Sequence, residues 1–234
     1  MIQRSAPRVR LGLASAAVIA LLVLSTGSVA ADTTPGGDGT FAQNGTTAEA
    51  FGSDCTPNGN DTTTCSEIGL SVFVGKMSDS FSGVSHANQV CAYVANYTYD
   101  DITGDPVGDP VFESGCEVDL SKAAIRIGRN LSSVTVASTT VSIAEYICDE
   151  FTCEPGASPD ITVVGTWTGV GPISYSKSRS TYDDGTCRSS DSGKGSSREA
   201  TFVGTVDGQT ITGEKSYAAI SNGKFTYRSR CIEI

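Results

Sequence analysis

The chain has 234 residues and a formal net charge of −10, with 26 acidic residues against 16 Lys and Arg. This balance excludes nucleic acid as an expected partner, because phosphate backbones are bound by basic surfaces. The single histidine and the absence of any Cys-x-x-Cys pair argue against a zinc site.

Residues 1–30 have the three parts of a secretory signal peptide. Three arginines come first, an apolar run covers 11–24, and small residues at 28–30 suit signal peptidase. An uncleaved anchor is the alternative, but the run is shorter than the roughly 20 residues that a membrane-spanning helix needs. We expect a secreted product without a membrane partner, whose 13 basic and 26 acidic residues give a net charge of −13.

Residues 31–66 are rich in Thr, Gly and Asn and carry few apolar side chains. Such a segment buries too little surface to offset the entropy that ordering costs. We therefore expect a flexible leader, followed by a single folded domain over 67–234.

Alternating apolar and polar residues predict β-strands throughout 67–234. Leu70, Val72 and Val74 share one strand face. Trp167 lies on the apolar face of a later predicted strand, and we expect it to anchor the core. The predicted fold class is all-β. An antiparallel β-sandwich is favoured, and an up-and-down β-barrel is the alternative.

Three Asx-Gly pairs in the C-terminal part predict two-residue hairpin turns. They are Asp184-Gly185, Asp207-Gly208 and Asn222-Gly223. The second turn would pair Val206 with Gln209, and the third would pair Ile220 with Phe225. The apolar residues of 134–143 change parity midway, which predicts a β-bulge.

Eight cysteines in an exported chain predict four disulfides. We expect local pairing: Cys55 with Cys65, Cys91 with Cys116, Cys148 with Cys153, and Cys187 with Cys231.

Three tyrosines, Tyr93, Tyr97 and Tyr99, fall on one face of a predicted strand whose other face is apolar. Flat aromatic rings on a solvent-facing sheet suit the stacking of sugars, so these residues are the candidate ligand site. The alternative is an aromatic ladder that only stabilises the sheet.

Four aspartates lie within ten residues, at Asp100, Asp101, Asp105 and Asp109. Calcium takes six to eight oxygen ligands, so it is the one cofactor considered for this loop. The spacing does not match an EF-hand, and a plain turn-rich loop is the favoured interpretation.

Charge is segregated along the chain. Residues 32–160 hold 4 basic and 19 acidic groups, whereas residues 161–234 hold 9 basic and 7 acidic groups. One interpretation is that the two parts pack together and neutralise each other. The other is a basic strip that binds an anionic surface polymer.

No catalytic constellation emerges. His86 directly follows Ser85, and neighbouring strand residues point to opposite faces, so a Ser–His pair is disfavoured. The Asp-Ser-Gly triplet at 191–193 lacks the second copy that aspartic-protease chemistry needs. We expect a non-enzymatic extracellular interaction module that contacts a glycan or a protein. A β-barrel carrier of a small apolar ligand and an extracellular hydrolase are the alternatives.

Overall fold

The computed structural model describes residues 39–79, 85–86, 88–108, 110–121, 123–148, 153–211 and 216–231. This part of the chain is almost entirely β-strand, with one 3-10 turn, η1 (Arg129–Leu131). The strands are β1 (Gly39–Pro57), β2 (Thr62–Asp79), β3 (Ser85–His86), β4 (Gln89–Asp100), β5 (Val111–Glu117), β6 (Ile125–Ile127), β7 (Ser133–Ser142), β8 (Ala144–Cys148), β9 (Cys153–Pro155), β10 (Asp160–Gly169), β11 (Ser174–Asp183), β12 (Cys187–Val206), β13 (Gln209–Thr210) and β14 (Tyr217–Cys231). The predicted signal peptide over 1–30 lies outside the described residues.

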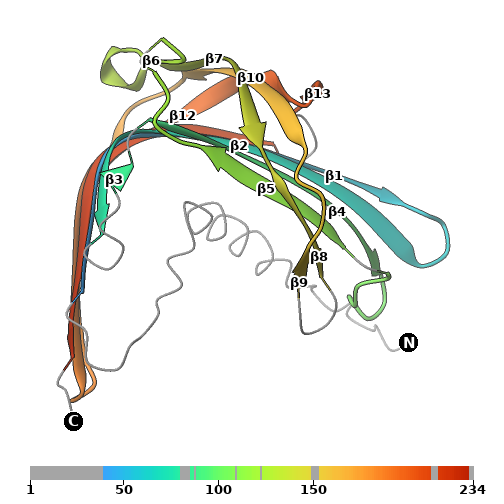
Figure 1. The fold of residues 1–234 in the computed structure, drawn as a ribbon, viewed down its shortest axis with the longest axis horizontal. Helices are drawn as coiled ribbons and strands as arrows, with labels where there is room; N and C mark the ends of the chain where they lie inside the picture. Colours follow the sequence, from blue (N-terminus) through green and yellow to red (C-terminus); the bar gives the residue numbers. More distant parts are fainter. Residues whose placement is uncertain are drawn as a thin grey trace, which may run out of the picture.

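All described strands belong to one antiparallel sheet. Its order is β6-β7-β10-β12-β14-β1-β2-β4-β5-β8-β9, with β11 and β13 added on β12 and β3 added on β2. The path has two free ends, so the sheet is not a closed up-and-down barrel. Figure 1 shows it as an arch with a second, smaller layer over the top.

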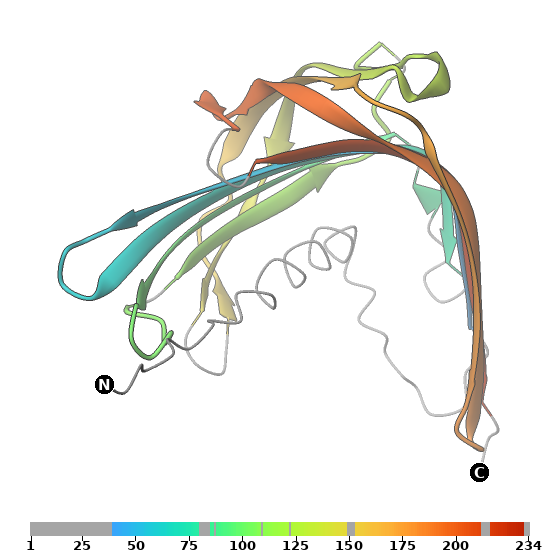
Figure 2. The ribbon, with the colours of Figure 1, turned by 180° about the vertical axis from the view of Figure 1, so that it is seen from behind.

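The sheet folds over itself because two stretches of chain run through both layers. β12 pairs with β14 over 187–199 and with β10 over 200–206. β7 pairs with β10, and beyond Ile143 the chain continues as β8, which pairs with β5. The small layer therefore contains β6, β7, β10, β13 and the end of β12, and it faces a large layer built from the other strands (Figures 1 and 2). This arrangement confirms the predicted antiparallel sandwich.

The hydrophobic core fills the space between the two layers. The large layer contributes Leu70, Val72 and Val90, and the small layer contributes Val163 and Trp167, all of them buried. Each such aliphatic side chain contributes about 1.5–3 kcal/mol relative to an exposed one. The predicted role of Trp167 as a core anchor is confirmed.

The predicted hairpin between β12 and β13 is confirmed. Val206 pairs with Gln209, and φ is 49° at Asp207 and 75° at Gly208, as a tight turn of this type requires. The pair Asp184-Gly185 also lies in a turn, between β11 and β12, and φ is 85° at Gly185.

The turn predicted at 222–223 is wrong. Both residues lie in the middle of β14, where Ile220 pairs with Ala48 and Phe225 pairs with Gln43 rather than with each other. β14 has a partner on each side, β1 and β12. Pairing along both edges satisfies more backbone groups than a local hairpin would, so tertiary context overrides turn propensity.

The predicted bulge is present in β7. Val163 of β10 pairs with Thr139 and Gly165 pairs with Val136, so β7 carries one extra residue between these pairs. The extra residue returns both apolar parts of β7 to the core face.

Contrary to the expected flexible leader over 31–66, residues 39–57 form β1. This strand lies between β14 and β2, and Ala48 and Ala50 on it are buried in the core. Small side chains bury little apolar surface by themselves, but a central strand also forms backbone hydrogen bonds along both of its edges. That long-range contribution is not visible in local composition.

Three predicted disulfides are confirmed: Cys55–Cys65, Cys91–Cys116 and Cys187–Cys231. In each one, the two cysteines are direct partners on neighbouring antiparallel strands. Cys148 and Cys153 are backbone partners of β8 and β9, and their side chains lie outside the described set.

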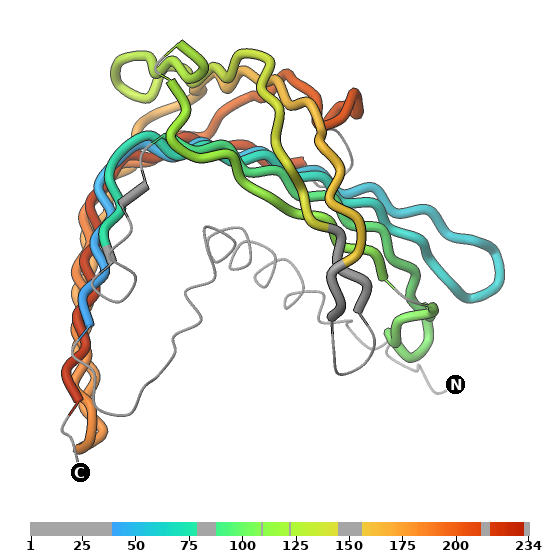
Figure 3. The backbone as a smooth tube through the Cα atoms, in the orientation of Figure 1, coloured from blue at the N-terminus to red at the C-terminus, as the bar shows by residue number. Residues whose placement is uncertain are grey.

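Beyond the small layer, the large layer continues as an extension one sheet thick, which we call the wing. It contains residues 39–46, 74–78, 174–183, 187–196 and 222–231, and it forms the descending arm that ends near the C-terminus (Figure 3). Every residue of its edge strand, β11, is exposed.

The wing begins at a bend marked by a row of glycines. These direct partners on four neighbouring strands are Gly195, Gly223, Gly45 and Gly75. A Cβ atom on Gly45 would lie 2.4 Å from the carbonyl oxygen of Val74, and one on Gly75 would lie 2.3 Å from that of Asn44. The strands therefore approach more closely than side chains allow, and glycine permits the bend.

Candidate functional site

A row of lysines crosses the wing at a single register. Lys177 of β11 pairs with Lys194 of β12, which pairs with Lys224 of β14. Lys224 pairs with Asn44 of β1, which pairs with Lys76 of β2. Direct partners on antiparallel strands project from the same face, with Cβ atoms about 4.5–5.5 Å apart. We call these five residues the lysine row.

Five arginines share the face of the lysine row. Residues an even number of positions apart on a strand lie on one face, and this rule adds Arg179, Arg188, Arg198, Arg228 and Arg230. Farther along the same strands, this face carries Ile220 and Ala48, which pack in the core. Asp183, near the end of β11, is the only described acidic residue on the wing part of this face. We call the wing part of this face the cationic face.

The lysine row is unfavourable for folding. Like charges placed directly opposite each other destabilise a sheet, and Lys194 has such a neighbour on each side. The nearest wing carboxylate along β12, Asp191, projects from the opposite face and accepts a hydrogen bond from the hydroxyl of Ser180. All three lysines are exposed, so packing does not account for their adjacency.

Polar uncharged side chains flank the lysine row along the same face. Ser196, Asn222 and Thr46 are direct partners on one side of it, and Ser192 and Thr226 are partners on the other side. The amide of Asn222 donates a hydrogen bond to the hydroxyl of Thr46 at 2.8 Å. The cationic face thus alternates charge with hydroxyl and amide groups.

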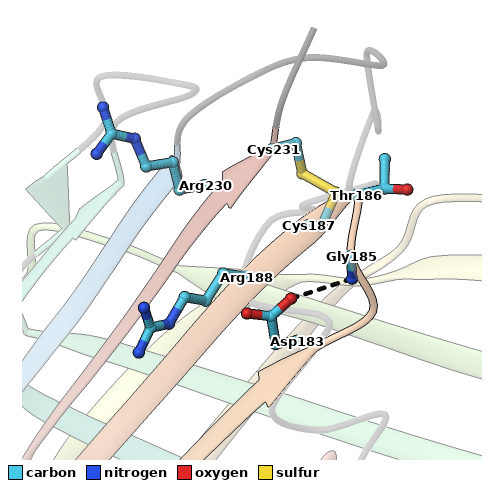
Figure 4. Close-up of a pocket in the computed structure, with 7 residues that line it drawn as sticks. All are labelled: Asp183, Gly185, Thr186, Cys187, Arg188, Arg230 and Cys231. Atoms are coloured by element: carbon cyan, nitrogen blue, oxygen red, sulfur yellow. Dashed lines mark hydrogen bonds between the residues drawn. A yellow bond between two sulfur atoms is a disulfide. The ribbon is translucent and has the colours of Figure 1, made fainter. Parts of the chain in front are cut away.

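At the tip of the wing, the cationic face ends in a hollow of about 510 Å³ lined by Asp183, Gly185, Thr186, Cys187, Arg188, Arg230 and Cys231 (Figure 4). The turn beside it is held by Asp184, whose Oδ1 accepts the backbone N–H groups of Cys187 at 2.6 Å and Thr186 at 2.9 Å. These two hydrogen bonds lower the pKa of the Asp184 carboxyl below its usual value.

The predicted tyrosine site is not an exposed row. Tyr93, Tyr97 and Tyr99 alternate along β4, but Tyr93 is only 7% exposed and the other two are half-buried. The hydroxyl of Tyr97 donates a hydrogen bond to Oε1 of the buried Glu67 at 2.8 Å. Burial, followed by this hydrogen bond, raises the pKa of Tyr97. Sugar binding here stays a prediction, and the burial of Tyr93 weighs against it.

Two carboxylates of the acidic loop accept hydrogen bonds from the protein itself, one from the loop's own turn and one from β2. Asp100 Oδ1 accepts the backbone N–H groups of residues 102 and 103, each at 2.8 Å, which lowers the pKa of Asp100. Asp101 accepts the hydroxyl of Thr63 at 2.7 Å. Within the described residues, which include Asp105 but not Asp109, no three candidate metal ligands come together. Calcium binding stays an untested prediction.

Comparison with known proteins supplies no relative from which a function could be carried over. No family model, curated protein or solved structure matches the chain. The described residues also contain no helix with the length and apolar character to cross a bilayer. Function must therefore be argued from the cationic face itself.

The sequence contained one signal for this face, the recurrence of basic residues at even spacings. Lys177 and Arg179 are two apart, and so are Arg228 and Arg230. The register of β11, β12 and β14 places both pairs on one face. Without that register the two pairs cannot be assigned to one face. The turn predicted at 222–223 would have interrupted β14 and so excluded this register.

Proposed function

We propose that this protein is an extracellular module that binds an anionic glycan through the cationic face of the wing. The observation that carries the proposal is the lysine row, in which Lys177, Lys194 and Lys224 are consecutive direct partners. Their mutual repulsion destabilises the folded protein, and an anionic ligand would relieve it on binding.

The shape of the wing suits an extended polymer better than a small anion. The wing part of the cationic face is one sheet thick, and from Ser196 to Arg188 it extends eight residues along β12. At about 3.4 Å per residue, this distance is roughly 27 Å. A polymer lying along the strands could therefore meet several basic side chains at once and release counterions at each of them.

The hydroxyl and amide groups that flank the lysine row favour a glycan over other polyanions. Ser196, Asn222 and Thr46 offer donors and acceptors that match sugar hydroxyls, while the lysines match carboxylate or sulfate groups. The chain's net charge of −10 opposes every polyanion alike, so these flanking groups, rather than charge, favour a glycan over duplex nucleic acid. The predicted secretion of the chain also favours a ligand outside the cell.

The test is binding of fluorescent heparin, polygalacturonate and neutral dextran of equal length, followed by polarisation over a salt series. We expect the two anionic glycans to bind, with affinity falling as salt rises, and dextran not to bind. Replacing Lys177, Lys194 and Lys224 together by Gln should remove most of this binding.

The matched control is Arg126→Gln with Arg129→Gln, compared with Lys194→Gln with Lys224→Gln, so that each variant loses two positive charges. The control pair is exposed on the small-layer side of the molecule. This control should leave glycan binding unchanged. Equal losses in both variants would mean that overall charge, not the cationic face, causes binding. Tighter binding to a DNA duplex than to either glycan would overturn the assignment of the ligand.

A further inference from the structure

We infer that the open edge of β11 is a self-association surface, on which a second copy of this chain pairs its own β11 antiparallel about a two-fold axis at Ser180. This inference is independent of the proposed glycan binding, because it concerns the edge of the wing rather than its cationic face. A two-fold pairing uses the same edge in both copies, so the assembly closes as a dimer.

β11 is a long open edge. Over its ten residues, Ser174–Asp183, it pairs with β12 on one side, and in the part of the chain that the structure describes no strand pairs with its other side. All ten residues are exposed. The strand has neither a proline nor a bulge, which are two of the devices by which proteins protect sheet edges. A regular edge of this kind offers unpaired backbone groups to another strand.

The backbone groups that point outward can be assigned from the turn beside β11. The N–H of Asp184 donates to the carbonyl of Cys187 at 3.2 Å, so these two residues form a hydrogen-bonded pair. Hydrogen-bonded and non-hydrogen-bonded pairs alternate along an antiparallel ladder, and the register from Asp183 back to Ser174 is uninterrupted. Even-numbered residues of β11 therefore bond to β12, and odd-numbered residues direct their N–H and C=O groups to the open edge.

Pairing about Ser180 uses these outward groups and also matches the charges. It sets Arg179 opposite Thr181 of the second copy and Lys177 opposite the second copy's Asp183, and symmetry repeats both contacts. Each of these pairs joins odd-numbered residues, which can exchange two hydrogen bonds, or about eight over the four pairs. The four residues project from the cationic face, and opposite charges placed directly across a strand pair stabilise a sheet.

Neighbouring registers match the charges less well or overlap less. Pairing about Arg179 would set this arginine against its own copy, and pairing about Ser178 would set Lys177 against Arg179. Pairing about Thr181 would bring Arg179 to Asp183, but over a shorter overlap of the two strands. Basic side chains normally protect an edge, and the register about Ser180 is the longest one in which they meet no like charge.

The shape of the molecule leaves room for this pairing. The wing projects beyond the small layer as the descending arm in Figures 1 and 3. In an antiparallel pair about Ser180, two wings overlap over 177–183 and point in opposite directions. The small layers then lie at opposite ends of the dimer, and both cationic faces turn to the same side.

The first test places a thiol on the two-fold axis of the oxidised full-length protein. The variant Ser180→Cys would put this thiol opposite its own copy at a non-hydrogen-bonded position, where Cα atoms are about 4.5 Å apart and a disulfide fits. Ser176→Cys is the matched control, since residue 176 is exposed on the same face of the same strand. We expect Ser180→Cys to form the intermolecular disulfide at least about tenfold faster than the control. Faster cross-linking of Thr181→Cys than of Ser180→Cys would overturn the register.

The second test follows the dimer by sedimentation velocity over a concentration series. Thr181→Pro removes an outward N–H and leaves the hydrogen bonds to β12 in place. It should abolish the dimer while the emission of Trp167 shows that the fold is kept.

A charge exchange tests the register in the same assay. Lys177→Glu turns two attractive pairs of the dimer into repulsive ones, so it should weaken the dimer about tenfold. Adding Asp183→Lys should restore the dimer. An unaltered protein that stays monomeric up to about 1 mM, or a dimer that survives Thr181→Pro, would overturn the inference. Neither readout involves a glycan, so failure here would leave heparin binding intact, and loss of heparin binding would leave the dimer intact.

Discussion

Reversing the charge at Lys194 should make the protein more stable while weakening its binding to anionic glycans. Lys194 stands between Lys177 and Lys224 as the direct partner of both. The substitution Lys194→Glu turns two like-charge pairs into two opposite-charge pairs. Lys and Glu fit strands about equally poorly, so strand propensity changes little.

The expected magnitude follows from the pair geometry. A cross-strand charge pair changes stability by roughly 0.2–1 kcal/mol, and two pairs change sign here. We expect the free energy of unfolding to rise by about 1 kcal/mol, which for a domain of this size is about 2–4 °C in Tm. The effect should fade in 1 M NaCl, where the Debye length falls to about 3 Å.

The assay is thermal unfolding followed by the emission of Trp167, the only tryptophan and a fully buried one. Arg126→Glu is the control, because its direct partner in β7 is the uncharged Thr135. It should leave Tm nearly unchanged. If Lys194→Glu lowered Tm, or if its gain persisted in 1 M NaCl, the lysine row would not be a strained electrostatic feature, and the main argument for a binding role would fail.

Four other substitutions probe features that support the site. Tyr97→Phe removes a donor from the buried Glu67 and should destabilise the fold by about 1–3 kcal/mol in urea unfolding; an unchanged midpoint would show that the carboxylate is satisfied elsewhere. Gly75→Ala places a Cβ 2.3 Å from a backbone oxygen and should cost more than about 2 kcal/mol. Gly193→Ala, whose nearest neighbour is a movable serine hydroxyl at 3.0 Å, should be tolerated, and equal losses would contradict the bend argument. Asp184→Ala should lower Tm at pH 7. Because the folded pKa of Asp184 is below the usual 3.8, its contribution is complete above that value and is lost as pH falls through the folded pKa. The melting temperatures of the two proteins should therefore converge as the pH falls below 3.8.

Local patterns were sufficient to predict the strands, the sandwich, the bulge in β7 and three disulfides. Each depends on short-range information, such as alternation around Leu70 or a parity change between Val136 and Val141. Cysteine pairing succeeded because the partners lie close in sequence, 10 to 44 residues apart.

The failures share a cause, which is pairing between distant strands. β1 looked like a leader because its composition is small and polar, yet it gains two neighbouring strands. Asn222-Gly223 looked like a turn because local propensity favours one. The cationic face depends on the same long-range register, so composition could report an excess of basic residues but could not assign them to one surface.

The position of β1 has a consequence for the order in which the molecule can assemble. The first described strand pairs along thirteen residues with the last, from Gly39 opposite Ser229 to Phe51 opposite Tyr217. The ribosome releases the chain from its N-terminus, so the edge of β1 that pairs with β14 stays uncovered until β14 has been synthesised. Such distant pairing slows folding. This edge of the nascent chain therefore stays open until β14 has been made, and the lysine row, which needs β11, β12 and β14 together, forms only then.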